Sequence, residues 1–131
     1  MDIGTVILNK SSSIDIDKAF QETIDSDDNY YPSPALFVYT LPNIMAGEIC
    51  IRHKFKGENT VFIKKEFSAE FVQDYVSLLF QKEKAKICIT GWVEVNDDEY
   101  KSLLMLVENT NFAKPYGSGH AFNTNAINKL F

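Results

Sequence analysis

Two cysteines and two histidines are the residues of this chain best suited to nucleophilic catalysis or zinc binding. Cys88 lies between two isoleucines in an apolar stretch, and Cys50 directly follows Ile49. A thiol in such surroundings packs as a small apolar side chain and is a poor nucleophile. No Cys-x-x-Cys spacing is present either. The sequence therefore predicts two buried, free thiols in a reducing compartment.

The histidines, His53 and His120, are far apart in the sequence. Cys50 and His53 could share one helix face, but a zinc site needs three or four ligands at suitable spacing. We therefore interpret His53 as a surface residue beside Lys54. No glycine-rich phosphate loop or nucleophile elbow occurs, and Gly117-Ser118-Gly119 indicates a flexible turn because no strand precedes it. We expect neither a metal nor a cofactor.

An acidic run begins like a calcium-binding loop, with Asp25, Asp27 and Asn29 at alternate positions. The loop requires glycine next, where this chain has Tyr30, and a bidentate glutamate later, where it has Leu36. We interpret the run as a solvated acidic turn and not as a calcium site.

Aromatic side chains gather in the first half of the chain and leave two interpretations open. They could line an apolar ligand groove, or they could be ordinary core and interface residues. The residues concerned are Tyr30, Tyr31, Phe37, Tyr39 and Phe55.

The elements that must position these residues follow from hydrophobic periodicity and from turn residues. The patterns predict strands over 3–9, 60–63, 86–95 and 100–107, although 103–107 would also fit a buried helix. Helices are predicted over 14–24, from Pro34 after a Ser33 cap, from Pro42 to about Arg52, and after a Ser68 cap. A short terminal helix is a further expectation. Strands that alternate with helices imply parallel pairs, here with one antiparallel hairpin, and hence an α/β layered sandwich.

Length and charge limit the classes of function. The 131 residues, 45% hydrophobic and 24% charged, suit one folded domain, with 110–131 as a polar C-terminal tail. A net charge of −5 disfavours binding to nucleic acid or to an anionic membrane. No secretory signal is recognisable, and no apolar run approaches the roughly 18 residues of a membrane span. We expect a cytoplasmic protein.

Two segments resemble the N-terminal half of a β-ketoacyl-acyl-carrier-protein synthase, a member of the thiolase-like superfamily. One is the segment from Ser33 to Thr60, with Ser-Pro-Ala-Leu-Phe, Pro-Asn and Ala-Gly in order. The other is Ile87-Cys88-Ile89-Thr90-Gly91-Trp92-Val93-Glu94. The resemblance covers residues 30 to 95, about half of the chain. It implies a truncated ketosynthase-like fold with a mainly parallel sheet and a single ketosynthase N-terminal-like domain over 1–131.

The resemblance also implies that this chain does not condense acyl groups. The family's nucleophilic cysteine would fall near Glu66, in Lys65-Glu66-Phe67-Ser68-Ala69, where no thiol is present. A glutamate cannot form the acyl thioester that the cysteine forms. The family's catalytic histidines have no aligned counterpart. We therefore expect no catalytic residue here.

The expected role is that of an inactive accessory or partner subunit in fatty-acid or polyketide biosynthesis, of the aryl-polyene type. In the family, the strand before the nucleophile pairs across a two-fold axis; here that strand is Thr60, Val61, Phe62 and Ile63. The expected partner is a second copy or a full-length ketosynthase, with acyl carrier protein as a further candidate. Two alternatives remain: a small acyl-chain or ligand-binding α/β module, and an enzyme of another class.

Overall fold

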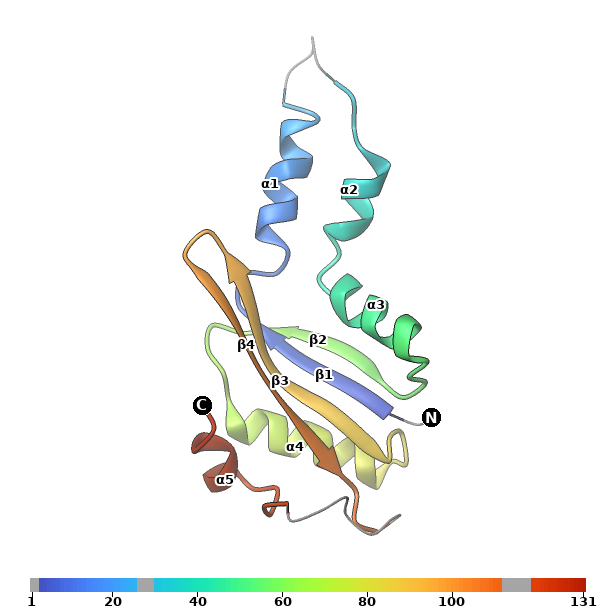
Figure 1. Cartoon of the computed structure of the whole chain (residues 1–131), viewed down its shortest axis with the longest axis vertical. Helices are drawn as coiled ribbons and strands as arrows, with labels where there is room; N and C mark the ends of the chain where they lie inside the picture. The colour runs from blue at the N-terminus through green and yellow to red at the C-terminus, as the bar shows by residue number, and fades with distance from the viewer. Residues whose placement is uncertain (1–2, 26–29, 112–118) are drawn as a thin grey trace.

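A four-stranded sheet forms the centre of the computed structural model, which describes residues 3–25, 30–111 and 119–131. The strand order is β2-β1-β3-β4 (Figure 1). β1 pairs in parallel with β2 and β3, while β4 returns antiparallel to β3. The predicted parallel strands and the terminal hairpin are therefore confirmed. The strands are β1 (Ile3–Asn9), β2 (Asn59–Ile63), β3 (Ile87–Asn96) and β4 (Glu99–Glu108).

Helices cover both faces of the sheet. Val6 and Leu8 of β1 belong to the apolar cluster that packs on α4, whereas Thr5 of β1 contacts Cys50 of α3. Because successive strand residues point to opposite faces, α3 and α4 lie on opposite sides of the sheet. The helices are α1 (Ile14–Glu22), α2 (Pro34–Tyr39), α3 (Ile44–His53), α4 (Ala69–Gln81) and α5 (Thr124–Asn128).

Helices α1 and α2 form an arm that extends beyond the sheet (Figure 1). They pack against each other, with the rings of Phe20 and Phe37 5.5 Å apart, and neither helix has a fully buried residue. An exposed ion pair joins Lys18 of α1 to Asp97 in the β3–β4 turn.

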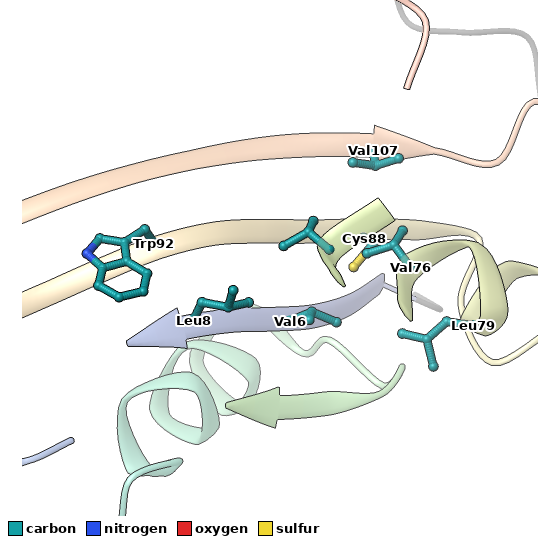
Figure 2. Packing of buried hydrophobic residues seen from close by; sticks show 8 residues of the cluster. Val6, Leu8, Val76, Leu79, Cys88, Trp92 and Val107 are labelled. Atoms are coloured by element: carbon teal, nitrogen blue, oxygen red, sulfur yellow. The ribbon is translucent and has the colours of Figure 1, made fainter. Parts of the chain in front are cut away.

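The main core lies between α4 and the sheet. Ser68 caps α4 by accepting the Phe71 N–H at 3.2 Å, as the sequence predicted. Val72, Val76 and Leu79 then recur at helical spacing and are buried. They belong to one cluster with apolar side chains from three strands, several of which Figure 2 labels: Val6 and Leu8, Cys88 and Trp92, and Val107.

The apolar run 103–107 is strand and not helix. It belongs to β4 and pairs with β3 from Trp92↔Leu103 to Cys88↔Val107. Val107 is buried, but Leu104 and Leu106 remain 45% and 59% exposed on the opposite face. The run is continuously apolar because this strand keeps apolar residues on its uncovered face as well. Such a run has no periodicity that would distinguish a strand from a buried helix.

Some predicted boundaries need correction or fall outside the described residues. Pro42 precedes α3 and does not lie in its first turn, because Asn43 is the N-cap and α3 begins at Ile44. The short terminal helix predicted within 110–131 is present as α5, and its Ile127 is buried. Asp27 and Asn29 of the acidic run, and positions 117 and 118 of the glycine-bearing turn, lie outside the described residues.

Glycine is required at position 91, where β3 and β4 approach closely. Gly91 has a backbone φ of +153°, a value that residues with a side chain rarely adopt. A Cβ at this position would lie 2.1 Å from the Leu103 carbonyl oxygen of β4. Any side chain would therefore push the hairpin strands apart.

Candidate functional site: an open sheet edge and two grooves

The position expected near a nucleophile holds an exposed carboxylate. Glu66 lies in the connection between β2 and α4, and its side chain is exposed to solvent. Its neighbour Phe67 stacks on the ring of Phe131, with centroids 3.5 Å apart. The structure thus places an aromatic ring from the C-terminal segment over part of this connection.

Neither thiol is placed for nucleophilic attack. Cys88 has no exposed surface, and burial raises the pKa of its thiol to about 12. Cys50 is 9% exposed, and its Sγ lies 3.5 Å from Thr5 Oγ1 on the α3 side of the sheet. In the described part of the chain, no hydrogen bond joins either cysteine to a histidine.

The histidines are likewise isolated from other ligands. His53 is exposed and stacks on Phe55 at 5.5 Å, and His120 is exposed near α5. Within the described ranges, no three residues among His, Cys, Asp and Glu converge as a metal site would require.

β2 forms an open edge of the sheet. Among the described residues it pairs only with β1. The Thr5 N–H donates to the Glu58 carbonyl at 2.7 Å, and the Lys64 N–H donates to the Asn9 carbonyl at 2.8 Å. Backbone groups of successive strand residues alternate in direction, so those of Asn59, Val61 and Ile63 point away from β1. With no partner in the described part of the chain, these donors and acceptors are available to a further strand.

The two edges of the sheet differ in charge. β2 reads Asn-Thr-Val-Phe-Ile and has no charged residue, and Ile63 is 49% exposed. β4 carries Glu99, Lys101 and Glu108. Charged side chains on an edge strand discourage pairing with another chain. The β2 edge is therefore the better surface for strand addition.

Aromatic packing beneath β2 holds this edge in place. The Phe62 ring meets the rings of Phe71 and Tyr75 edge-on, with both centroids 4.8 Å away. The Lys64 ammonium lies 3.9 Å from the centroid of Phe71. Because Phe62 faces α4, it supports the strand from below and does not project from the edge.

Two grooves complete the candidate sites. The larger, about 490 Å³, lies between the end of β4 and the segment around α5, and His120 is part of its wall. The smaller, about 310 Å³, lies where β1, β2 and β3 end, beneath α1 and the α2–α3 connection. We call it the strand-end groove. Of the five aromatics that could have lined a groove, Tyr39 alone lines either of these two.

A buried carboxylate fixes the chain where β1 leaves the sheet toward the arm. Glu94 has no exposed surface and accepts the N–H groups of Lys10 and Ser11 and the amide of Asn96. Burial alone would raise the pKa of Glu94, but hydrogen bonds from Ser11, Lys10 and Asn96 outweigh it and lower this pKa. The carboxylate is therefore held in its charged form.

Comparison with solved structures assigns the fold. The mostly parallel four-stranded sheet with helices around it has the same fold as part of a solved ketosynthase-type structure. A similar structure is described as "The ishigamide ketosynthase/chain length factor", with a TM-score of 0.69 and 20% sequence identity. The match covers 86% of this chain and 37% of that chain, so this chain spans little more than a third of its length.

The other comparisons found no relative. No family model matches the sequence, and no curated protein does. Among the described residues, no helix is long and apolar enough to cross a membrane.

Proposed function

We propose that this chain is a non-condensing, ketosynthase-like subunit that works in the cytoplasm beside a ketosynthase in fatty-acid or polyketide biosynthesis, of the aryl-polyene type. The observation that carries the proposal is the structural match over 86% of the chain to a ketosynthase/chain length factor.

The chemistry of the described site supports a role without acyl transfer. Claisen condensation on a ketosynthase begins with a thiolate nucleophile. At the corresponding connection this chain has Glu66, and its two cysteines are buried elsewhere. A carboxylate in solvent has no means of holding an acyl thioester.

The β2 edge supports assembly with a partner of the same fold. It is uncharged, its outward backbone groups are unpaired among the described residues, and Phe62 anchors it on α4. Strand addition from an equivalent edge would satisfy those groups and cover Ile63. The partner we propose is a ketosynthase-type subunit, and a second copy of this chain is the other outcome of the test.

Intact mass spectrometry tests the absence of condensing chemistry. The purified chain is incubated with malonyl- and acyl-loaded carrier proteins, and we expect no covalent acyl adduct. Glu66→Gln should leave both this result and the assembly of the subunit unchanged. An acyl adduct on any residue, or an activity lost on Glu66→Gln, would make this chain an enzyme and overturn the proposal.

Sedimentation velocity tests the assembly. The chain is measured at micromolar concentration, alone and mixed in turn with each ketosynthase of the source organism. We expect a complex that Ile63→Lys weakens at least tenfold, because a lysine on the edge blocks strand addition. The matched control is Tyr100→Lys, which adds the same charge to a residue 89% exposed on β4.

Two results would contradict this part of the proposal. One is a chain that stays monomeric alone and with every ketosynthase. The other is a complex that Tyr100→Lys disrupts and Ile63→Lys does not, which would assign the contact to β4.

A further inference from the structure

Basic residues gather at the amino ends of the parallel strands. Two loops lie there, one between α3 and β2 and one between α4 and β3 (Figure 1). The Gly57 N–H of the first loop donates to the Ile3 carbonyl at 3.0 Å, and Ala85 of the second lies 3.2 Å from the place of a Cβ on Gly4. Both loops therefore flank the start of β1. Together with the last turn of α3 they carry five residues that we call the basic end: Arg52, Lys54, Lys56, Lys82 and Lys84.

The charges of the basic end are not neutralised within the described part of the chain. All five side chains are exposed, and among the described residues none of them takes part in a hydrogen bond or an ion pair. Two carboxylates lie beside them, Glu58 and Glu83, and the Glu58 carboxylate already accepts the Thr60 hydroxyl at 2.8 Å. Lys86 and Glu108 are also found at this end, with opposite charges. The basic end therefore keeps an excess of positive charge, although the whole chain has a net charge of −5.

Acidic residues gather at the opposite ends of the strands. α1 follows the carboxyl end of β1, and the hairpin turn follows the carboxyl end of β3. The pKa of Lys18 is raised by its hydrogen bond to Asp97 and by the charges of Asp97, Asp15 and Asp98, so one ammonium group is shared among three carboxylates. The other described basic residues at this end are Lys10 and Lys101. We call its seven carboxylates the acidic end: Asp15, Asp17, Glu22, Asp25, Asp97, Asp98 and Glu99.

Each end also exposes apolar side chains. Ile51 is 78% exposed directly before Arg52, and on the arm Phe37 of α2 is 57% exposed. Protein interfaces combine apolar contacts with charged groups at the rim. Nucleic acid and anionic membrane need a continuous positive surface, which a chain of net charge −5 with Ile51 among its basic residues does not provide. The basic end therefore fits an acidic protein.

The two ends of one chain are too far apart to neutralise each other. They are separated by the length of β1, which has seven residues and therefore spans about 23 Å. This distance is more than two Debye lengths at physiological ionic strength, where that length is about 8 Å. The arm also extends away from the sheet (Figure 1). The acidic protein surface that the structure itself supplies to the basic end is therefore the arm of a second copy.

We propose that copies of this chain bind head to tail, with the acidic end of one copy, through its arm, on the basic end of the next. Such a contact joins two different surfaces and leaves one of each free, so further copies can add. A single exposed ion pair contributes little to binding. The contact therefore depends on several pairs together and on the apolar side chains, Ile51 and Phe37, that it covers. It is separate from the β2 edge and does not depend on the proposed function.

Sedimentation velocity over about 10 to 300 μM tests the proposal. The Ile63→Lys variant is the starting chain, so that pairing at the β2 edge does not contribute. We expect species larger than a monomer that increase with concentration. Because salt screens exposed charges, the association constant should fall at least tenfold between about 50 mM and about 500 mM salt.

Two pairs of charge reversals locate the contact. Lys56→Glu with Lys84→Glu changes one residue from each loop of the basic end, and Glu22→Lys with Asp25→Lys changes two residues of the acidic end. We expect either double variant alone to associate at least tenfold more weakly than the starting chain. An equimolar mixture of the two should recover the association, because every contact then joins opposite charges. Recovery also shows that both variants are folded.

The matched control is Lys65→Glu with Lys129→Glu, which reverses two exposed lysines outside both ends and should associate like the starting chain. Three outcomes would overturn the proposal: a monomer at every concentration in low salt, association that salt does not weaken, and a mixture no more associated than its two components. A monomeric chain that instead binds a DNA duplex of about 20 base pairs through Lys56 and Lys84 would make the basic end a nucleic-acid surface and overturn it equally.

Discussion

The Glu94 carboxylate on β3 accepts the backbone N–H of Lys10 at 2.7 Å, directly after β1 ends and where the chain turns toward the arm. Glu94 is fully buried, and Ser11 and Asn96 donate to the same carboxylate. One side chain thereby replaces the strand partner that the backbone loses as it leaves the sheet.

We expect Glu94→Gln to lower the free energy of unfolding by about 1–3 kcal/mol, because charge-assisted hydrogen bonds are lost and one amide donor faces other donors. Denaturant unfolding measures the change. Glu99→Gln, an exposed site on β4, should have little effect. Equal stabilities for the two variants would mean that the contact contributes nothing.

The pH dependence of stability follows from the lowered pKa of Glu94. A carboxyl with a lower pKa in the folded state stabilises the fold above its unfolded pKa, about 4.3 for glutamate. That contribution is lost as the pH falls through the folded value. The stability difference between wild type and Glu94→Gln should therefore shrink below about pH 4. A difference that grows in acid would contradict the assignment.

Gly91→Ala should destabilise the hairpin by about 2 kcal/mol or more, because its Cβ would overlap the Leu103 carbonyl and strain the backbone. Gly119→Ala is the matched control, since a Cβ there meets nothing within 4 Å. Thermal unfolding of the two variants makes the comparison. If Gly91→Ala unfolds at the same temperature as the wild type, β3 and β4 do not approach each other closely at this position.

Ser68→Ala should cost about 1 kcal/mol, the usual value for a lost N-cap. Ser77→Ala, in the middle of the same helix, is expected to be neutral or slightly stabilising, since alanine favours helix. Chemical denaturation measures the free energy of unfolding of each variant. A larger loss at Ser77 than at Ser68 would rule out the cap as a main contribution.

Cys88 should react with iodoacetamide only after the chain unfolds. Its thiol is buried and its raised pKa, about 12, leaves almost no thiolate at neutral pH. A Cys50→Ser variant isolates this thiol, and mass spectrometry follows labelling with and without denaturant. Rapid labelling under native conditions would show that the core opens around α4.

The sheet could be predicted from the sequence because its strands differ clearly from their surroundings. Ile3 to Asn9 is apolar and ends at a polar run, and the Ser68 cap precedes a clear helical period. The apolar run 103–107 remained ambiguous because an edge strand can keep apolar residues on both faces. The role of Pro42 was misjudged because proline is compatible both with a first helical turn and with the turn before it.

The sites were less predictable because they depend on contacts between distant residues. Asn9 looks in the sequence like the polar end of a strand, and no local pattern shows that its amide reaches Val93 or that its Oδ1 is unpaired. The five aromatics suggested one groove, but Tyr30 and Tyr31 are exposed and Phe37 packs on Phe20. The sequence shows that aromatic residues are frequent in this half of the chain, but it does not show whether their side chains meet in one groove.

The position of β1 in the sheet affects how the chain can fold during synthesis. β1 is first in sequence but central in the sheet, and its Ile3 pairs with Ile87. All seven residues of this strand are buried in the finished fold. Vectorial synthesis therefore produces an apolar strand long before its second neighbour exists, and pairing at this separation is slow. We expect nascent chains stalled before β3 to need a chaperone, and full-length chains to be released from it.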